Sequence, residues 1–311
     1  MTQAGKMHPR RGRARRTLEN GGTPLGVVRQ ELARLHRHPR KSLGQHFLSD
    51  PSIAERIIAL TRAQPTNRIV EIGPGLGALT DLLVERCSAL WSIEVDDDFA
   101  ERLRARYADR SHVHIVHEDV LAVDFPGLLG PGTPAIVVGN LPYNIATAVL
   151  ERLLATPHCF ARMVLMVQRE VAERLRAQPG VKAYSALSVF TQLAARVEFG
   201  LRVRPGAFVP QPRVDSEVVI VEPYRRPPVE LQDPAAFDRI VRTAFNQRRK
   251  QLGNSLRSIH PGAADVLRTL GIDPARRPET LTLAEFAAIA NASPLRQAAM
   301  PDALVPSRQG R

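Results

Sequence analysis

Short apolar runs recur along the first two-thirds of the chain, and each is long enough for one buried strand. They occupy residues 68–72, 90–94, 113–117, 135–139 and 164–167. The stretches between them carry apolar residues at helical spacing, as at Leu79, Leu82 and Leu83. Strands that alternate with helices in this way predict an α/β fold, in which a parallel sheet is covered by helices on both faces.

A further helix is expected just before the first of these strands. Asp50 followed by Pro51 is typical of a helix N-terminus, because Asp caps free N–H groups and Pro fits the first turn. We expect this helix to bury Ile53, Ile57 and Ile58.

The pattern changes after about residue 195. Residues 196–222 read as two strands joined by a long loop with three prolines, and Pro223 and the pair at 227–228 mark a linker. Residues 229–292 predict a small helical domain, and residues 293–311 predict a disordered tail.

The net charge of +12 is concentrated at the N-terminus. Residues 1–40 hold ten Lys and Arg against Glu19 and Glu31, a net +8. We interpret residues 1–38 as a basic, disordered arm that contacts RNA phosphates. A transit peptide is the alternative, and the lack of serine in this segment disfavours it. A translation start at Met7 is also compatible with the sequence.

A second basic cluster lies in the predicted helical domain, at Arg248, Arg249 and Lys250. A solvated helix face is the usual explanation of such a run. Here the cluster directly follows a predicted helix with an apolar face and has little acidic opposition, so we favour contact with RNA phosphates.

The remaining composition narrows the class of protein. A chain of 311 residues is large enough for one sizeable core plus an appended domain, without a stabilising disulfide or metal. Cys87 and Cys159 lack metal-ligand spacing and are expected to be core residues in a reducing cytosol. No apolar stretch reaches the length of a membrane span. We therefore expect a cytoplasmic protein with no metal and no membrane partner.

A nucleotide-type cofactor site is predicted where the first three strands end. Gly73, Gly75 and Gly77 form a turn that lets a ligand approach the backbone closely. Glu94 ends the second strand, about 20 residues beyond the glycines, where acids bind ribose hydroxyls. Asp119 follows the third strand and could accept from an adenine amino group. The alternative for both carboxylates is that they cap helix N-termini or lie exposed in loops.

Two cofactors compete for this site. NAD is disfavoured because the turn reads G-x-G-x-G rather than G-x-G-x-x-G and no residue suited to hydride transfer is evident. S-adenosylmethionine suits the set better, with Glu94 at the ribose, Asp119 at the adenine and the glycine turn at the methionine part.

The fourth strand leads directly into Asn140, Leu141, Pro142 and Tyr143. The Asn side-chain oxygen and the Leu141 carbonyl can each accept a hydrogen from the amino group of a planar base. Pro142 favours an extended conformation at Leu141, and Tyr143 can stack on the base. An ordinary proline turn at the end of a strand is the alternative.

Together these motifs resemble the rRNA adenine N6-dimethyltransferases. The similar segments are residues 41–48 (KSLGQHFL), 71–77 (EIGPGLG), 139–145 (GNLPYNI), 208–216 (FVPQPRVDS) and 244–250 (AFNQRRK). The last of these is similar to the small-subunit rRNA enzymes rather than to the related Erm antibiotic-resistance methylases. The resemblance runs from about residue 40 to residue 292.

The resemblance implies a class I S-adenosylmethionine-dependent methyltransferase domain at residues 39–224, Rossmann-like, with an antiparallel end to its sheet. The helical domain at residues 229–292 would contact RNA. The implied cofactor residues are His46, Leu48, Gly73, Gly75, Glu94, Asp119 and Asn140. The target adenine would lie between Tyr143 and Phe208. Two departures are His46, where many relatives carry Asn, and Ala146, where Ser is more usual.

The implied activity is dimethylation of N6 on two adjacent adenines near the 3′ end of small-subunit (16S) rRNA during subunit biogenesis. The expected partners are this rRNA and an immature 30S-type subunit, and we expect a monomer. An Erm-type enzyme that methylates large-subunit (23S) rRNA and confers macrolide resistance is one alternative. A ribosome-assembly factor without catalytic activity is another.

Overall fold

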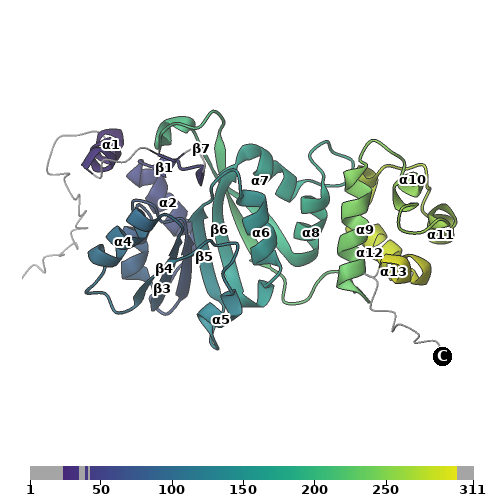
Figure 1. The fold of residues 1–311 in the computed structure, drawn as a ribbon, viewed down its shortest axis with the longest axis horizontal. Helices are drawn as coiled ribbons and strands as arrows, with labels where there is room; N and C mark the ends of the chain where they lie inside the picture. Colours follow the sequence, from purple (N-terminus) through teal and green to yellow (C-terminus); the bar gives the residue numbers. More distant parts are fainter. Residues whose placement is uncertain (1–23, 35–38, 41–42, 300–311) are drawn as a thin grey trace, which may run out of the picture.

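The computed structural model describes residues 24–34, 39–40 and 43–299, which form a central sheet beside a cluster of short helices (Figure 1). The sheet has seven strands in the order β4-β3-β2-β5-β6-β9-β7, and β1 and β8 form a separate pair. The strands are β1 (Phe47–Leu48), β2 (Arg68–Ile72), β3 (Ala89–Glu94), β4 (Val113–His117), β5 (Ala135–Asn140), β6 (Phe160–Gln168), β7 (Ala195–Val203), β8 (Phe208–Val209) and β9 (Ser216–Pro223).

Strands β2 to β6 run parallel, and only β9 runs against its neighbours in this sheet. The predicted α/β class, the parallel sheet and its antiparallel end are therefore confirmed. The chain moves outward from β2 to β3 and β4, and then returns to place β5 on the other side of β2. Ligands bind at such a reversal, where the carboxyl ends of adjacent strands diverge.

Side chains of the central strands alternate between two apolar layers. Val70 and Ile72 contribute to one core cluster, whereas Ile69 beside them contributes to the other. Because side chains of a strand point alternately to the two faces, a strand buried on both faces is apolar throughout. This explains the continuous apolar runs in the sequence.

Helices cover both faces of the sheet and continue into the C-terminal cluster. They are α1 (Pro24–Arg34), α2 (Pro51–Thr61), α3 (Thr80–Leu83), α4 (Asp97–Arg106), α5 (Phe125–Leu129), α6 (Ala146–Leu154), α7 (Arg169–Arg176), α8 (Ala186–Ala194), α9 (Pro234–Asn246), α10 (Leu252–Leu256), α11 (Ala263–Thr269), α12 (Leu283–Asn291) and α13 (Ser293–Ala299). Asp50 caps α2 as predicted, with its carboxylate accepting from the Ser52 and Ile53 N–H groups. Ile57 and Ile58 are buried, and Ile53 is half-buried. The helix expected through residues 79–84 is shorter and passes into a 3₁₀ turn.

The C-terminal helices share one apolar core, and α8 lies between this core and the sheet (Figure 1). Phe237, Ile240 and Phe286 are fully buried in it. Tyr184, which precedes α8, and Val189, which lies in it, belong to the same cluster. The helical region is thus packed onto the α/β part.

Two segments expected to be disordered contain helices. In the tail, α13 buries Leu295 completely against the C-terminal core. In the N-terminal arm, α1 buries Leu32 with Phe47, Phe99 and Val209. The expectation was wrong for these parts because each helix has an apolar face with a partner distant in sequence. Residues 1–23, 35–38 and 300–311, which hold the rest of both segments, lie outside the described residues. No helix in the described part is long and apolar enough to cross a membrane.

Candidate active site

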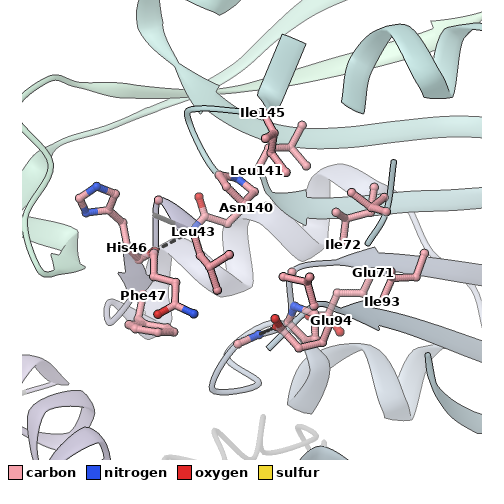
Figure 2. A pocket seen from close by; sticks show the side chains of 18 of the residues that line it. Leu43, His46, Phe47, Glu71, Ile72, Ile93, Glu94, Asn140, Leu141 and Ile145 are labelled. Atoms are coloured by element: carbon pink, nitrogen blue, oxygen red, sulfur yellow. Dashed lines mark hydrogen bonds between the residues drawn. The ribbon is translucent and has the colours of Figure 1, made fainter. Parts of the chain in front are cut away.

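A cleft lies at the carboxyl ends of β2, β3, β4 and β5 (Figure 2). Its walls contain nearly all the residues that were predicted to bind cofactor or base. These are His46, Leu48, Gly73, Gly75, Glu94, Asp119, Asn140, Leu141, Pro142 and Tyr143. Five separate segments of the chain therefore meet at one site.

The glycine turn forms the floor of the cleft. Gly73, Gly75 and Gly77 have φ values of 65°, 54° and 87°, which other residues adopt only with strain. A Cβ on Gly75 would lie 3.0 Å from the Phe47 ring, so a side chain there would also press on the opposite wall of the cleft. The turn requires glycine both for its conformation and for the space above it.

Glu94 is held in place by the backbone around it. One carboxylate oxygen accepts from the Gly75 N–H at 3.0 Å, and the other accepts from the Asp96 N–H at 2.9 Å. Burial raises the pKa of this carboxyl, against the lowering effect of the backbone donors. Asp119 is exposed at the cleft and uses Oδ1 to accept from the Leu121 N–H at 2.9 Å.

A second buried acid, Glu71, was not predicted as a separate feature of the site. Its Oε2 accepts from the Thr80 and Ser92 hydroxyls, both at 2.8 Å. Burial raises its pKa to about 7, and the two hydroxyl donors oppose that rise. The sequence feature that could have indicated Glu71 is an acidic residue inside an otherwise apolar predicted strand.

Residues 43–48 form a wall of the cleft and are fastened to the other walls. The Asn140 amide donates to the His46 carbonyl at 2.8 Å, and Gln45 donates to the Asp96 carboxylate at 3.2 Å. Arg40 forms an ion pair with Asp96 at 3.4 Å. Asp96 is 3% exposed and also caps α4, so it connects this wall to the loop after Glu94. Asp96 was not predicted, because its partners lie some 50 residues away in the sequence.

Residues 140–143, which were predicted to bind the base, are held in place by hydrogen bonds to neighbouring segments. Because Asn140 uses its Nδ2 to donate to the His46 carbonyl, its Oδ1 is the amide atom left to accept from a ligand. Leu141 is buried, and its N–H donates to the Met166 carbonyl at 3.0 Å. The Tyr143 hydroxyl bonds to the Ser216 hydroxyl, which fixes the ring at the mouth of the cleft.

The structure does not bring Phe208 to this site. Its side chain is 0% exposed and packs in the core beneath β1, opposite Leu48 in the strand pair. The aromatic ring beside Tyr143 is His46, whose centroid lies 5.2 Å away at 29°. The sandwich of Tyr143 and Phe208 expected from the resemblance is thus not formed here, because Phe208 points to the core side of β8.

Ala146 and the three residues of the basic cluster lie elsewhere. Ala146 is buried at the start of α6, where its methyl contributes to the core. Arg248, Arg249 and Lys250 follow the end of α9, outside the cleft. Arg248 donates to the Lys182 carbonyl, whereas Arg249 and Lys250 are exposed.

These residues fit S-adenosylmethionine. The Glu94 carboxylate would hold the ribose hydroxyls, Asp119 the adenine amino group, and the bare glycine turn would accommodate the methionine part. Within the described residues, no three His, Cys, Asp or Glu side chains gather as metal ligands would.

The strand order, the reversed β9 and this cleft define a class I S-adenosylmethionine-dependent methyltransferase. The model of the ribosomal RNA adenine dimethylase family matches residues 36–293. The chain belongs to this family, and S-adenosylmethionine is its methyl donor.

Relatives and solved structures agree with this assignment. The chain is 44% identical over 260 residues to the ribosomal RNA small subunit methyltransferase A of Geobacter metallireducens, covering 81% of this chain and 94% of that protein. It is 46% identical over 257 residues to the protein of the same name from Geobacter sulfurreducens, covering 80% and 93%.

Two crystal structures share the fold. A dimethyladenosine transferase from Plasmodium falciparum aligns with a TM-score of 0.67 at 24% identity, over 78% of this chain and 96% of that one. The 23S rRNA methyltransferase ErmE aligns with a TM-score of 0.59 at 25% identity, over 78% and 97%.

Proposed function

We propose that this protein transfers methyl groups to N6 of two adjacent adenines near the 3′ end of small-subunit (16S) rRNA during subunit biogenesis. It acts in the cytoplasm, as a monomer, on an immature 30S-type subunit. The observation that carries this proposal is the anchored Asn140 amide, whose free oxygen lies in the same cleft as Glu94. The small-subunit relatives are 44% and 46% identical to this chain, which supports this substrate over large-subunit rRNA.

The chemical problem lies with the acceptor nitrogen. S-adenosylmethionine supplies an already activated methyl group, so the reaction needs no metal and no covalent intermediate on the protein. Adenine N6 shares its lone pair with the ring and is therefore a weak nucleophile. Acceptance of its two hydrogens by Asn140 Oδ1 and the Leu141 carbonyl favours a pyramidal nitrogen with a directed lone pair. Positioning and preorganised acceptors then account for the rate.

The base must leave its helical stack to reach these acceptors. Tyr143 provides a stacking face next to them, and its bond to Ser216 holds the hydroxyl end of the ring in place. After the first transfer, the monomethylated base rebinds with one N–H donor fewer. Its single N–H can then donate to only one of the two acceptors, Asn140 Oδ1 or the Leu141 carbonyl, so the second transfer relies on one of them.

RNA docking is assigned to the helical region at residues 229–292, and methyl transfer to residues 39–224. Arg249 and Lys250 are exposed after α9 and can neutralise phosphates. Arg248 has a mixed role, because its bond to the Lys182 carbonyl also ties the helical region to the segment before α8. We therefore assign it a smaller share of the RNA contact.

Labelled methyl transfer to three substrates tests the main proposal. Immature small subunits should be methylated, whereas mature small subunits and naked large-subunit RNA should not. Asn140→Ala should abolish transfer to the first substrate. Preferred methylation of naked large-subunit RNA would instead support the Erm-type alternative. Normal subunit binding without transfer would support the assembly-factor alternative.

Salt dependence of RNA binding tests the docking surface. Substitution of Arg249 and Lys250 by Gln should weaken RNA binding and reduce the slope of log K against log salt by about 2. Exchange of Arg56 and Arg104 for Gln is the matched control, because both are exposed on helices of the α/β part. Equal slopes for both variants would contradict the assignment.

A further inference from the structure

We infer that three arginines at the mouth of the cleft, Arg202, Arg204 and Arg213, bind phosphates of the RNA strand that carries the target adenine. These three arginines are called the rim. The inference rests on the proposed function and deepens it. It assigns a second RNA contact, which lies next to the cleft and apart from Arg249 and Lys250.

The rim belongs to segments that border the cleft on the side of β9 and β7. Val203, at the end of β7, lies opposite Ser216 at the start of β9, and the Ser216 hydroxyl bonds to the Tyr143 hydroxyl. Two rim residues flank Val203 in the sequence, and the third lies three residues before Ser216. The Pro210 carbonyl, in the loop between β8 and β9, lies 2.8 Å from His46 Nδ1, so this loop also contacts a wall of the cleft.

Most of the positive charge of the rim is not used within the protein. All three side chains are exposed, and Arg204 and Arg213 take part in no ion pair among the described residues. The acid opposite Arg202 in the ladder is Glu217, which is 2% exposed and already forms an ion pair with Arg176. Burial raises the pKa of Glu217, and the charges of Arg176 and Arg202 oppose that rise. Two or more of the rim charges are therefore available to a ligand.

The two sides of the cleft differ in charge. Strands β4 and β7 are the two edges of the sheet (Figure 1). Residues 202–215, at the β7 edge, contain three arginines and a single acid, Asp215. The loops after β3 and β4 instead present the exposed carboxylates of Asp97, Glu118 and Asp119. Phosphates are therefore attracted to the β7 side of the mouth and repelled from these loops.

The target adenine brings its own phosphates to this place. A base that is turned out of its stack stays attached to the strand, so the phosphates on either side of it remain at the mouth of the cleft. The rim lies where such phosphates must pass, and this selects an RNA strand over an acidic protein as its ligand.

An exposed aromatic ring extends the surface along β7. Phe199 lies three residues before Arg202 and is 51% exposed, and the Arg176 guanidinium lies 5.7 Å from its ring centroid. Rings set among arginines are typical of surfaces that bind single-stranded nucleic acid, because the ring stacks on a base while the cations neutralise phosphates. Phe199 therefore provides a stacking position for a neighbouring base of the same strand.

The salt dependence of RNA binding tests the rim, with a short single-stranded RNA that contains two adjacent adenines. Exchange of all three rim arginines for Gln should weaken binding and reduce the slope of log K against log salt by about 2, since each phosphate contact of a single strand contributes about 0.7. Exchange of Arg56, Arg62 and Arg104 for Gln is the matched control, because these arginines are exposed on or beside α2 and α4 and carry the same charge. Cofactor affinity by calorimetry should be equal in wild type and both variants.

A photocrosslink tests where the strand lies. A 4-thiouridine placed next to the adenines of the same RNA should crosslink to residues 199–215 rather than to residues 95–119. In single-turnover methylation of immature small subunits, the rim variant should need a higher subunit concentration for its half-maximal rate. Its maximal rate should stay near that of wild type, because the rim holds the strand without touching N6.

Several outcomes would overturn the inference. Equal salt slopes for the rim variant and the control variant would do so, as would crosslinks confined to residues 95–119. A weaker cofactor affinity of the rim variant would return these arginines to a structural role. Unchanged binding of the short RNA together with weaker binding of whole subunits would indicate a protein partner instead. Each of these leaves the proposed function intact, whereas a wild-type protein that binds the RNA but methylates no small subunit would refute the proposed function and leave the rim supported by its salt slope.

Discussion

The buried acid Glu71 gives a prediction whose size follows from the structure. It is 1% exposed in β2, and its only described side-chain donors are the hydroxyls of Thr80 and Ser92. A Gln side chain has the same shape, and its carbonyl oxygen can accept from both hydroxyls. Glu71→Gln therefore removes the ionisation while leaving the packing in place.

The direction of the pKa shift of Glu71 determines how the stability of the protein changes with pH. Burial raises the pKa of Glu71 from 4.5 to about 7, so the folded state holds this proton more tightly than the unfolded chain. Below pH 4.5 the carboxyl is neutral in both the folded and the unfolded state, and its burial does not lower the free energy of unfolding. As the pH rises from 4.5 to about 7, the folded protein loses stability, and above that the loss is complete. A shift of this size corresponds to about 3 kcal/mol.

Urea unfolding at about pH 4 and about pH 8 measures this difference. Glu71→Gln and wild type should be similarly stable at the lower pH, and the variant should be more stable by about 3 kcal/mol at the higher pH. Glu55→Gln, an exposed acid on α2, is the matched control and should show no such change between the two pH values. A stability difference for Glu71→Gln that stays constant across this pH range would refute the reasoning.

Three further predictions concern single side chains. Glu94→Ala should weaken S-adenosylmethionine binding by about 1–3 kcal/mol, because the ribose hydroxyls lose a buried charged acceptor. Calorimetry measures this loss beside the exposed control Glu101→Ala, and equal affinities for the two variants would remove Glu94 from the site. Leu295→Ala should destabilise the protein by about 2–3 kcal/mol in urea unfolding, because the Leu295 side chain is fully buried. Gln297→Ala is the control and should leave the stability unchanged. If residues 293–299 were disordered, neither variant would change the stability. Phe208→Leu should lower the melting temperature without changing cofactor affinity, and a stability equal to wild type would contradict its place in the core.

The fold and most of the cleft could be predicted from the sequence because their signals are local. A run such as residues 135–139 is apolar at every position only when both faces of a parallel strand are buried. Strand ends in a parallel sheet meet at one edge, so the strand pattern alone predicts that Gly73, Glu94, Asp119 and Asn140 lie together. The glycine turn and the Asp50 cap are equally local, since each depends on the backbone within a few residues.

Other features depend on contacts between distant segments, which a single sequence does not reveal. The helices at residues 24–34 and 293–299 form because a core far along the chain covers their apolar faces. Asp96 joins two walls of the cleft through Arg40 and Gln45, which are more than 50 residues away.

The two aromatic positions show the same division between sequence and structure. The motif around Phe208 indicates an aromatic residue near the site, but β8 pairs with β1 and so turns that ring into the core. The same pairing brings His46 to Tyr143. Sequence alone determined the fold class and the cofactor. Tertiary packing decided where the Phe208 ring lies, because a strand places its side chains on one face or the other only once it has a partner.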